Sequence, residues 1–344
     1  MRFLAPAVRF WQGSLRHKGV ESILYVRYKA SQVCNMNAPG SLVGAQGDVM
    51  TGAIRGFWAA TLTPLTAEGT VDHAALAGHA HNLFKRGLDG VVLFGTTGEG
   101  TTFNVAERVA TVEALLKAGV PASRIGMGGG FPAITDSIAL TRSMLSLGVN
   151  HVLILPPYFD RSVTPAGIED AFSAIFHAVA DERLRATLYH IPQISGVGIP
   201  VTVAASLRKR YGALVAGLKD SSGDFKQFQA FRAAAPELAI TVGNETDITR
   251  AIAAGGAGTI CGMCNIVPGL VQAMIDGSDG AEARMKAAID VVFSGPSLVP
   301  TLKAIIAAQT GDTGWVRVRP PLRAFSDGAP FKAKLDQLAS PALA

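Results

Sequence analysis

Between Gly56 and Gly262 the chain alternates eight short apolar runs with stretches of helical spacing. The apolar runs lie at residues 56–64, 89–95, 124–130, 151–157, 186–192, 213–219, 238–243 and 257–262. A buried parallel strand followed by an amphipathic helix is the repeating unit of α/β proteins, and eight such units close a barrel. We therefore predict an α/β fold of the TIM (β/α)8 barrel type.

The segments between and after these runs support the same fold. Helices are predicted at 71–86, 104–118, 134–147, 167–179, 202–211, 225–234 and 246–254. An open doubly wound sheet would give a similar alternation of strands and helices, but the early G-x-G-x-x-G turn typical of such sheets is missing. After Pro268 no strand pattern appears, and helical spacing returns at 270–275, 281–293 and 298–309. We expect a barrel of residues 53–266 and a C-terminal helical appendage of residues 267–344.

The N-terminal extension, residues 1–52, has a different character. It shows no sustained period, and its first 50 residues contain six Lys and Arg but two acidic residues. It is interpreted as a targeting peptide or as an upstream extension from a misplaced start, with Met36 or Met50 as the true beginning. The second interpretation is favoured because no cleavage signal is clear. The extension is not expected to be part of the core fold.

Composition argues against several classes of protein. The extension holds +4 of the net charge of +5, so the remaining body lacks the basic stripe that nucleic-acid binding requires. No apolar run reaches the roughly 18 residues of a membrane span. Cys34, Cys261 and Cys264 are too few for a disulfide scaffold and fit a reducing compartment. We expect a cytoplasmic protein that has neither nucleic acid nor a membrane as its partner.

Barrel enzymes carry their reacting groups at the C-terminal ends of the strands. Lys219 directly follows the run ALVAGL, where shielding from water favours the uncharged amine that attacks a ketone. Tyr189 ends another run, and its phenol could move protons beside that amine. The alternatives are a lysine that reaches solvent or pairs with Asp220, and a core tyrosine. His190 should point to the opposite face of its strand and pack there.

The segment GTTGEG at 95–100 follows the second run. Its glycines, Gly95 and Gly98, let backbone N–H groups approach an anion, and Thr96 and Thr97 add hydroxyl donors. A carboxylate suits this loop better than a nucleotide, because no lysine follows as in a P-loop. By itself the motif is weak, since Gly-Thr turns are common.

Other candidate sites are less convincing. Cys261-Gly-Met-Cys264 has the spacing of a redox or metal motif, but no second pair accompanies it. The seven histidines form no H-E-x-x-H motif. We predict neither a metal site nor an organic cofactor.

In this order, these strand-end motifs resemble the dihydrodipicolinate synthase / N-acetylneuraminate lyase family from about Gly56 to Leu322. The resemblance is carried by GTTGEG, by YHIP at 189–192 in place of the family's Y-N-x-P, and by GLKDSSGD at 217–224. GTICGMCNIVP at 258–268 and VRPPL at 318–322 are also similar. The resemblance implies a barrel with C-terminal helices, usually a homotetramer, that works without a metal or organic cofactor.

The resemblance also implies catalytic roles. Lys219 would form a Schiff base with pyruvate or a related 2-oxo acid. Tyr189 would shuttle protons and steady the imine, and Thr96 would link this tyrosine into a hydroxyl relay. Thr97, together with the amides of the loop, would hold the substrate carboxylate.

Two positions depart from the synthases. Their second relay tyrosine, contributed by a neighbouring subunit, corresponds here to Phe159, which cannot relay a proton, although Tyr158 is adjacent. Their arginine that grips the aldehyde's carboxylate corresponds to Ile194, which cannot make that bidentate contact. The surrounding PQISGV is closer to the sialic-acid-lyase branch. Asn244 and Glu245, after the seventh run, are expected to tune specificity.

We therefore predict a class I lyase or aldolase that cleaves, forms or dehydrates a hydroxylated 2-oxo acid. Its partners would be a small 2-oxo acid and further copies of itself, as a tetramer or dimer. One alternative is a 4-hydroxy-tetrahydrodipicolinate (dihydrodipicolinate) synthase in which another cation does the task of the residue at Ile194. A second is a non-catalytic sensor that binds a 2-oxo acid, an alternative that Phe159 favours because it cannot relay a proton. A third is nucleic-acid binding through the basic N-terminus.

Overall fold

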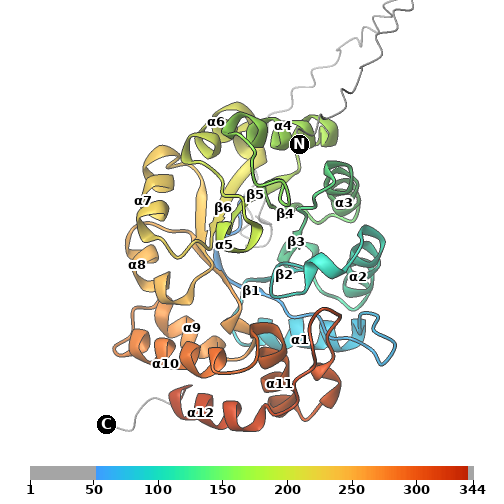
Figure 1. Cartoon of the computed structure of the whole chain (residues 1–344), viewed down its shortest axis with the longest axis vertical. Helices are drawn as coiled ribbons and strands as arrows, with labels where there is room; N and C mark the ends of the chain where they lie inside the picture. Colours follow the sequence, from blue (N-terminus) through green and yellow to red (C-terminus); the bar gives the residue numbers. More distant parts are fainter. Residues whose placement is uncertain (1–51, 340–344) are drawn as a thin grey trace, which may run out of the picture. The chain divides into compact units, whose positions relative to one another are not determined.

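The structure is a computed structural model that describes residues 52–339 (Figure 1). Eight parallel strands close into a barrel in chain order, and β1 pairs with β8. They are β1 (Gly56–Ala60), β2 (Gly90–Leu93), β3 (Ile125–Gly128), β4 (His151–Ile154), β5 (Arg185–His190), β6 (Val215–Asp220), β7 (Ala239–Val242) and β8 (Gly258–Cys261). The predicted (β/α)8 barrel is confirmed. The predicted N-terminal extension lies, except for its last residue, outside the described residues.

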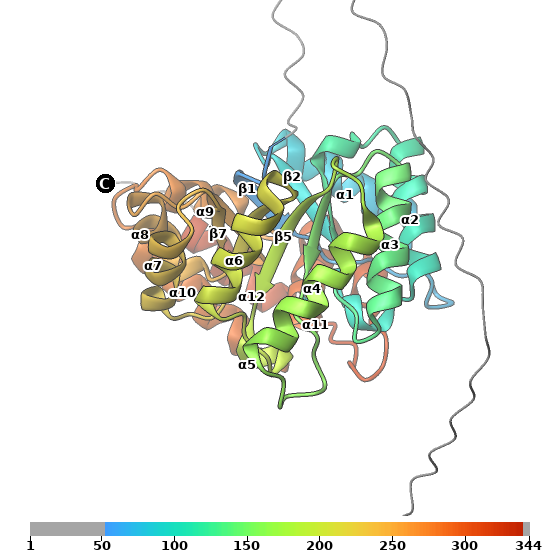
Figure 2. The ribbon, with the colours of Figure 1, turned by 90° about the horizontal axis from the view of Figure 1, so that it is seen from above.

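Helices follow the strands and cover the outside of the barrel (Figure 2). The longer ones are α1 (His73–Lys85), α2 (Val105–Lys117), α3 (Ile134–Ser146), α4 (Pro165–Val179), α6 (Val201–Tyr211), α7 (Phe225–Ala234) and α8 (Ile248–Ala253). Short 3-10 helices are η1 (Gly100–Thr102), η2 (Ala122–Arg124), η3 (Gly212–Leu214), η4 (Glu245–Asp247), η5 (Met263–Asn265) and η6 (Thr313–Val316).

Side-chain caps fix where several helices begin. The Asp72 side chain accepts a hydrogen bond from the Ala75 N–H, so α1 starts at His73, two residues later than predicted. Asn104 and Glu107 form a reciprocal capping box at the start of α2. These caps satisfy backbone N–H groups that have no partner within the first turn of a helix.

Two helices are missing from the sequence prediction. The short helix α5 (Pro192–Ser195) begins with a proline and ends at Gly196, which has a left-handed backbone. The apolar pattern instead predicts a fifth strand over residues 186–192, which overlaps the first residue of this helix. The last helix, α12 (Ala329–Ala339), has Leu335 as its one buried residue, so its sequence carries a weak apolar stripe.

The barrel interior is filled by its own small core. This cluster consists of Ile54, Trp58, Ala60, Val92, Leu153 and Ile260, and it is separate from the larger core between strands and helices. Trp58 is fully buried, and the ring of His151 meets it edge-on with centroids 5.7 Å apart. Burial lowers the pKa of His151 to about 4, so this ring is neutral at pH 7. The interior is therefore packed, and a ligand must bind at the mouth of the barrel.

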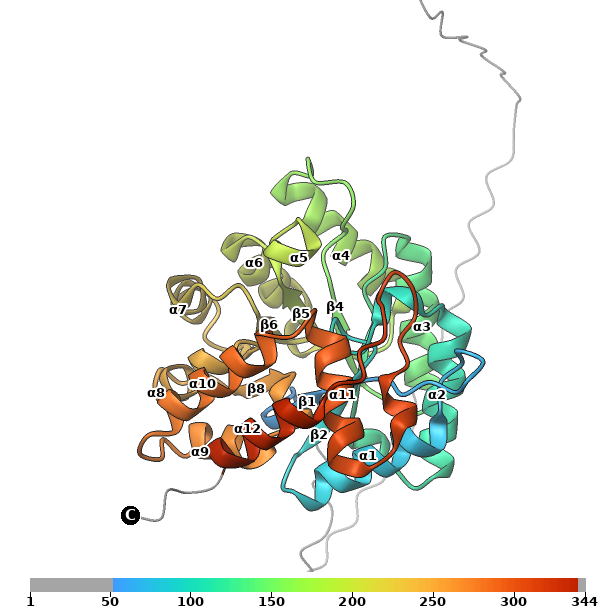
Figure 3. The same cartoon turned by 60° about the horizontal axis from the view of Figure 1, so that its bottom comes forward.

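The C-terminal helices pack together beside α1 and β8 (Figures 1 and 3). They are α9 (Pro268–Ile275), α10 (Ala281–Phe293), α11 (Leu298–Thr310) and α12. The predicted division after residue 266 falls between β8 and α9. Within residues 52–339, no single helix has the length and hydropathy of a membrane span. The pair α10 and α11 passes that test together but is bent by 103°.

The close packing of Trp58 gives a test of the barrel interior. A methyl group at Gly90 would overlap the Trp58 ring, so we expect Gly90→Ala to lower the free energy of unfolding by about 1–3 kcal/mol. Urea unfolding followed by circular dichroism measures this change. Gly78→Ala on α1 is the matched control, because its methyl group meets no atom within 4 Å. It should raise the unfolding free energy by about 0.5–1 kcal/mol. Equal effects of the two substitutions would contradict the packing described here.

Candidate active site

Strands β5 and β6 bring two central side chains together. Their register pairs Tyr189 with Lys219 and His190 with Asp220. Because side chains alternate along a strand, the first pair points to the barrel mouth and the second pair points outward. The Lys219 nitrogen lies 4.4 Å from the centre of the Tyr189 ring, and both residues are 5% exposed. The expected shielding of the Lys219 amine is confirmed, whereas its chemical role stays a prediction.

The two outward-facing residues have structural partners. The Nδ1 atom of His190 accepts a hydrogen bond from the Ile199 N–H at 2.9 Å, and its ring packs against Phe231. Burial lowers the pKa of His190 to about 4, so the neutral ring can accept this bond. Asp220 accepts a hydrogen bond from the Ser222 N–H at 2.9 Å, and burial raises the pKa of its carboxyl. The packing role predicted for His190 is confirmed.

The loop after β2 brings a hydroxyl group to Tyr189. The Thr96 Oγ1 and Tyr189 hydroxyl oxygens are 3.2 Å apart. The loop is tightly folded: a Cβ at Gly100 would overlap the Phe94 carbonyl, and the Gly98 carbonyl accepts a hydrogen bond from Thr63 Oγ1 at 2.8 Å. Glycine is required there by close backbone approach, which fixes the position of Thr96.

A cavity of about 190 Å³ surrounds the Lys219 side chain, and we call it the lysine cavity. Its lining brings together residues from the ends of six strands, from α5 and from the C-terminal helices. They include Ala60, Thr96, Thr97, Tyr189, Ile191, Ile194, Lys219, Ser221, Asn244, Glu245, Ile260, Cys261, Gly262, Met263, Phe293 and Leu302. This cavity unites most of the residues predicted from strand ends.

Glu245 places a carboxyl group in the wall of the lysine cavity. Its Oε1 atom accepts a hydrogen bond from the Met263 N–H at 3.0 Å. Burial raises the pKa of Glu245, and hydrogen bonds to its carboxylate, above all from the Met263 N–H, oppose this effect. A carboxyl group with a raised pKa near an amine is suited to hold or release a proton.

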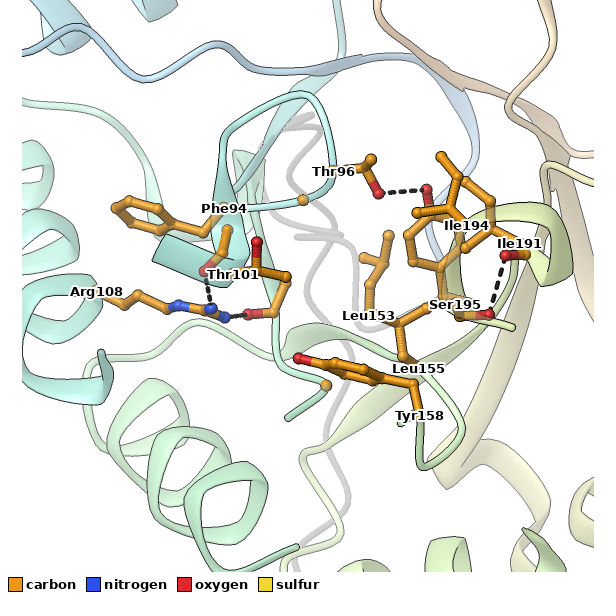
Figure 4. A pocket seen from close by; sticks show the side chains of 15 residues that line it. Phe94, Thr96, Thr101, Arg108, Leu153, Leu155, Tyr158, Ile191, Ile194 and Ser195 are labelled. Atoms are coloured by element: carbon orange, nitrogen blue, oxygen red, sulfur yellow. Dashed lines mark hydrogen bonds between the residues drawn. The ribbon is translucent and has the colours of Figure 1, made fainter. Parts of the chain in front are cut away.

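A second cavity of about 170 Å³, which Figure 4 shows from close by, adjoins the lysine cavity at Thr96 and Tyr189. The two cavities share four lining residues, which are Thr96, Tyr189, Ile191 and Ile194. Gly95, Leu153 and Leu155 also line this second cavity.

Arg108 and Tyr158 are two of the polar side chains that line the second cavity (Figure 4). The Arg108 guanidinium donates to the carbonyls of Gly100 and Gly128. These contacts hold the loops after β2 and β3 together. Burial raises the pKa of Tyr158, and the nearby Arg108 opposes this effect.

Two of the predicted binding residues line neither cavity. Gly98 packs against the backbone at Thr61, so it supports the loop and does not line a cavity. Phe159 is 90% exposed, with a left-handed backbone at φ 86°, in the segment between β4 and α4. In the described chain Phe159 therefore does not reach the site of its own barrel.

Ile194 stands at the rim of both cavities and is 60% exposed. Near it, the Arg161 side chain lies against the end of α5. Its Nε atom is 2.7 Å from the position that a Cβ would take at Gly196. Arg161 thus places a cation against the turn that contains Ile194.

A buried ion pair, absent from the sequence prediction, supports the loop of Thr96 and Thr97. Glu99 has a left-handed backbone at φ 57° and pairs with Lys303 of α11, and both side chains are fully buried. Lys303 also donates to the Arg317 carbonyl at 2.6 Å. Burial lowers the pKa of Lys303, and Glu99 opposes this effect. A single lysine within the apolar sequence of α11 was the signal that could have revealed the pair.

The two cysteines of the C-G-M-C motif are buried and free, with their sulfur atoms 3.2 Å apart. Cys264 also contacts the Trp58 carbonyl, and burial raises the pKa of its thiol. Over the described part of the chain, no group of three His, Cys, Asp or Glu side chains is placed to hold a metal ion.

Comparison with known proteins identifies the family. A model of the dihydrodipicolinate synthetase family matches residues 53–295. The chain belongs to this family. It is 38% identical over 281 residues to an uncharacterized DapA-like lyase of Chloroflexus aurantiacus, covering 79% of this chain and 92% of that protein. It is 29% identical over 244 residues to a 4-hydroxy-tetrahydrodipicolinate synthase of Shewanella sp. strain ANA-3, covering 70% and 81% of the two chains.

A solved structure of this family agrees with the fold described above. The crystal structure of dihydrodipicolinate synthase from Agrobacterium tumefaciens has a TM-score of 0.77 to this chain and 32% sequence identity. The match covers 83% of this chain and 99% of that chain. The chain is therefore an enzyme of the lyase and synthase type found in this family, as its strand-end motifs predicted.

The Glu99–Lys303 pair gives a test of how the site is supported. Within the described residues, Lys303→Met leaves the Glu99 carboxylate buried without a charged partner and with only the Arg319 N–H, at 3.0 Å, as a hydrogen-bond donor, so we expect a loss of about 3–5 kcal/mol in the free energy of unfolding. Urea unfolding measures this loss. Lys286→Met is the control, because its ion pair with Asp290 is exposed. The control should change stability by less than about 0.5 kcal/mol.

Adding Glu99→Gln to Lys303→Met removes the unpaired charge and should restore part of the lost stability. If Lys303→Met lowered the free energy of unfolding no more than Lys286→Met does, the result would contradict the buried ion pair.

Proposed function

We propose that the chain is a class I aldolase or lyase that holds a 2-oxo acid as a Schiff base on Lys219. The observation that carries this proposal is a buried amine that lies 4.4 Å from the Tyr189 ring and opens into the lysine cavity. The hydroxyl of Tyr189 is in turn hydrogen-bonded to Thr96. A shielded amine beside a proton-carrying phenol is the arrangement that imine formation requires.

The cycle follows from these neighbours. The substrate carboxylate is held by Thr97 and the loop that carries it, which leaves the ketone carbon facing Lys219. The uncharged amine attacks this carbon, and the hydroxyl of the resulting carbinolamine leaves as water when Tyr189 supplies a proton. The phenolate left on Tyr189 takes the proton of the substrate's C4 hydroxyl as the C3–C4 bond breaks, which releases an aldehyde, and the protonated imine accepts the electron pair of that bond to become an enamine. Tyr189 returns the proton to C3, which restores the protonated imine. Water finally hydrolyses the imine and frees the 2-oxo acid and the lysine.

The residues at the rim of the lysine cavity indicate the chemistry of the second substrate. Ile194 is an apolar residue at the position where the synthases carry an arginine, so it offers no bidentate contact to a carboxylate. We propose that the substrate is a hydroxylated 2-oxo acid that is cleaved, formed or dehydrated. Asn244 and Glu245 line the same cavity and offer an amide and a carboxyl to its hydroxyl groups.

We also propose an assembly and a location. Family resemblance suggests a homotetramer or dimer in which the exposed Phe159 of one copy approaches the second cavity of another. Such a contact would cover the ring that is 90% exposed in the single chain. The two free thiols Cys261 and Cys264, 3.2 Å apart, support a reducing compartment such as the cytoplasm.

Reductive trapping tests the Schiff base. We expect incubation with pyruvate and borohydride to leave a carboxyethyl group on the peptide that contains Lys219, as read by mass spectrometry. Lys219→Arg should abolish the adduct, because a guanidinium cannot form the imine. Lys226→Arg, on the exposed surface of α7, is the matched control and should keep it.

An adduct that persists in Lys219→Arg would disprove the proposed role of this amine. An adduct without turnover of any member of a panel of hydroxylated 2-oxo acids would favour the sensor alternative over the enzyme.

A second candidate function, 4-hydroxy-tetrahydrodipicolinate synthase, is favoured by one observation. Arg161 lies against the turn that contains Ile194 and could bind the carboxylate of aspartate semialdehyde. If so, Arg161→Gln should raise the KM for aspartate semialdehyde about tenfold with little change in kcat. A condensation assay with pyruvate measures both, and Arg183→Gln, on another exposed loop, is the control. Absence of condensation by the unmodified chain would reject this candidate.

A further inference from the structure

A third cavity is lined by residues of α1, η5, α11 and α12. Figures 1 and 3 show α1, α11 and α12 close together on the flank of the barrel. The cavity has a volume of about 270 Å³, and it shares no lining residue with the lysine cavity or the second cavity. The lining is largely polar and includes His79, Asn82, Arg86, Asn265, Gln309 and Lys332. We call it the flank cavity. Nothing in the proposed reaction uses these residues.

The hydrogen bonds of Asn265 determine which ring nitrogen of His79 is free to bind a ligand. The Nδ2 group of Asn265 donates to the carbonyls of Ala60 and Gly262, each at 2.8 Å. The Oδ1 atom of Asn265 is therefore the acceptor that faces Nε2 of His79 at 3.0 Å. Because an amide oxygen can only accept, Nε2 carries the proton and Nδ1 is left as a bare acceptor. Nδ1 has no hydrogen-bond partner among residues 52–339.

His79 is held in this neutral state. Burial, with a smaller contribution from the charge of Arg86, lowers the pKa of His79 to about 4, although Asn265 opposes the effect. The ring also packs against Trp315, with centroids 5.0 Å apart. A ligand that meets Nδ1 of His79 must therefore donate a hydrogen bond, as a hydroxyl group does.

The rim of the flank cavity carries positive charge. Arg86 has no carboxylate partner within the described residues, and partial burial lowers the pKa of its guanidinium. Lys332 is already paired with Asp336 at 2.6 Å. The cavity thus offers one uncompensated cation, which suits a ligand with one negative charge better than a dianion.

We propose that the flank cavity binds a small hydroxycarboxylate, with its carboxylate on Arg86 and its hydroxyl donating to Nδ1 of His79. The cavity volume lies just below the range of about 300–1,000 Å³ typical of small-molecule sites, so the ligand has few carbon atoms. A phosphate ester offers the same combination of anion and hydroxyl, but its second charge has no free cation to meet.

Asn265 connects this ligand to the barrel mouth. The two carbonyls that it holds belong to Ala60 and Gly262, and both residues line the lysine cavity. A ligand that fixes His79 also fixes Asn265 and, through it, one wall of that cavity. Binding itself does not depend on the Schiff-base proposal, so the two can fail separately.

The fluorescence of Trp315 reports on this cavity through the contact of its ring with His79. We expect lactate to change the tryptophan emission of the full chain and to bind with the same affinity in Lys219→Arg, as measured by calorimetry. The emission change should be lost in Trp315→Phe, which leaves the other tryptophans, Trp11 and Trp58, in place. Lactate, rather than a larger acid, is the probe because it carries one carboxylate and one hydroxyl.

Matched variants and a matched ligand separate the two proposed contacts. Arg86→Gln should weaken lactate binding at least about tenfold, since it removes a charge-assisted hydrogen bond. Lys85→Gln removes the same charge from the neighbouring residue, which does not line the cavity, and should leave the affinity unchanged. Propionate, which lacks the hydroxyl, should bind about fivefold more weakly than lactate.

Three results would overturn the proposal. The first is equal lactate affinity in Arg86→Gln and Lys85→Gln. The second is binding that disappears in Lys219→Arg but persists in Arg86→Gln, because the lysine cavity would then be the binding site. The third is equal affinity for propionate and lactate, or no binding of either.

Discussion

The ion pair between Glu99 and Lys303 connects the two parts of the protein on which the active site depends. The loop that carries Thr96 and Thr97 leaves the barrel after β2 and has no sheet hydrogen bonds of its own. Both charged groups are fully buried, so neither finds water in place of its partner if the other moves away. The C-terminal helices therefore help to support the loop that carries Thr96 and Thr97.

The sequence predicted those features of the site that depend on local patterns. Strand periodicity places Tyr189 and Lys219 at the ends of apolar runs, and alternation along the strand separates His190 from them. The closed barrel then turns these positions into one cavity. The expectation about Phe159 rested on alignment with a family motif, and this ring lies outside both cavities of the chain.

Contacts between distant parts of the chain could not be predicted in this way. Glu99 and Lys303 are 204 residues apart, and His79 and Asn265 are 186 residues apart. Neither pair belongs to a motif with a fixed spacing. Each depends on how α11 packs against the loop after β2, or η5 against α1, and packing of this kind is set by the whole fold. The polar residues were visible in the sequence, but their partners were not.

The wall between the lysine cavity and the second cavity consists of side chains that line both, which are Thr96, Tyr189, Ile191 and Ile194. The hydrogen bond between Thr96 and Tyr189 runs within this shared wall. In the proposed mechanism, a group that enters the second cavity and turns the Tyr189 ring also moves the proton donor beside Lys219. A bulky tail on a substrate would then change the reaction rate through this phenol without contacting the reacting carbon.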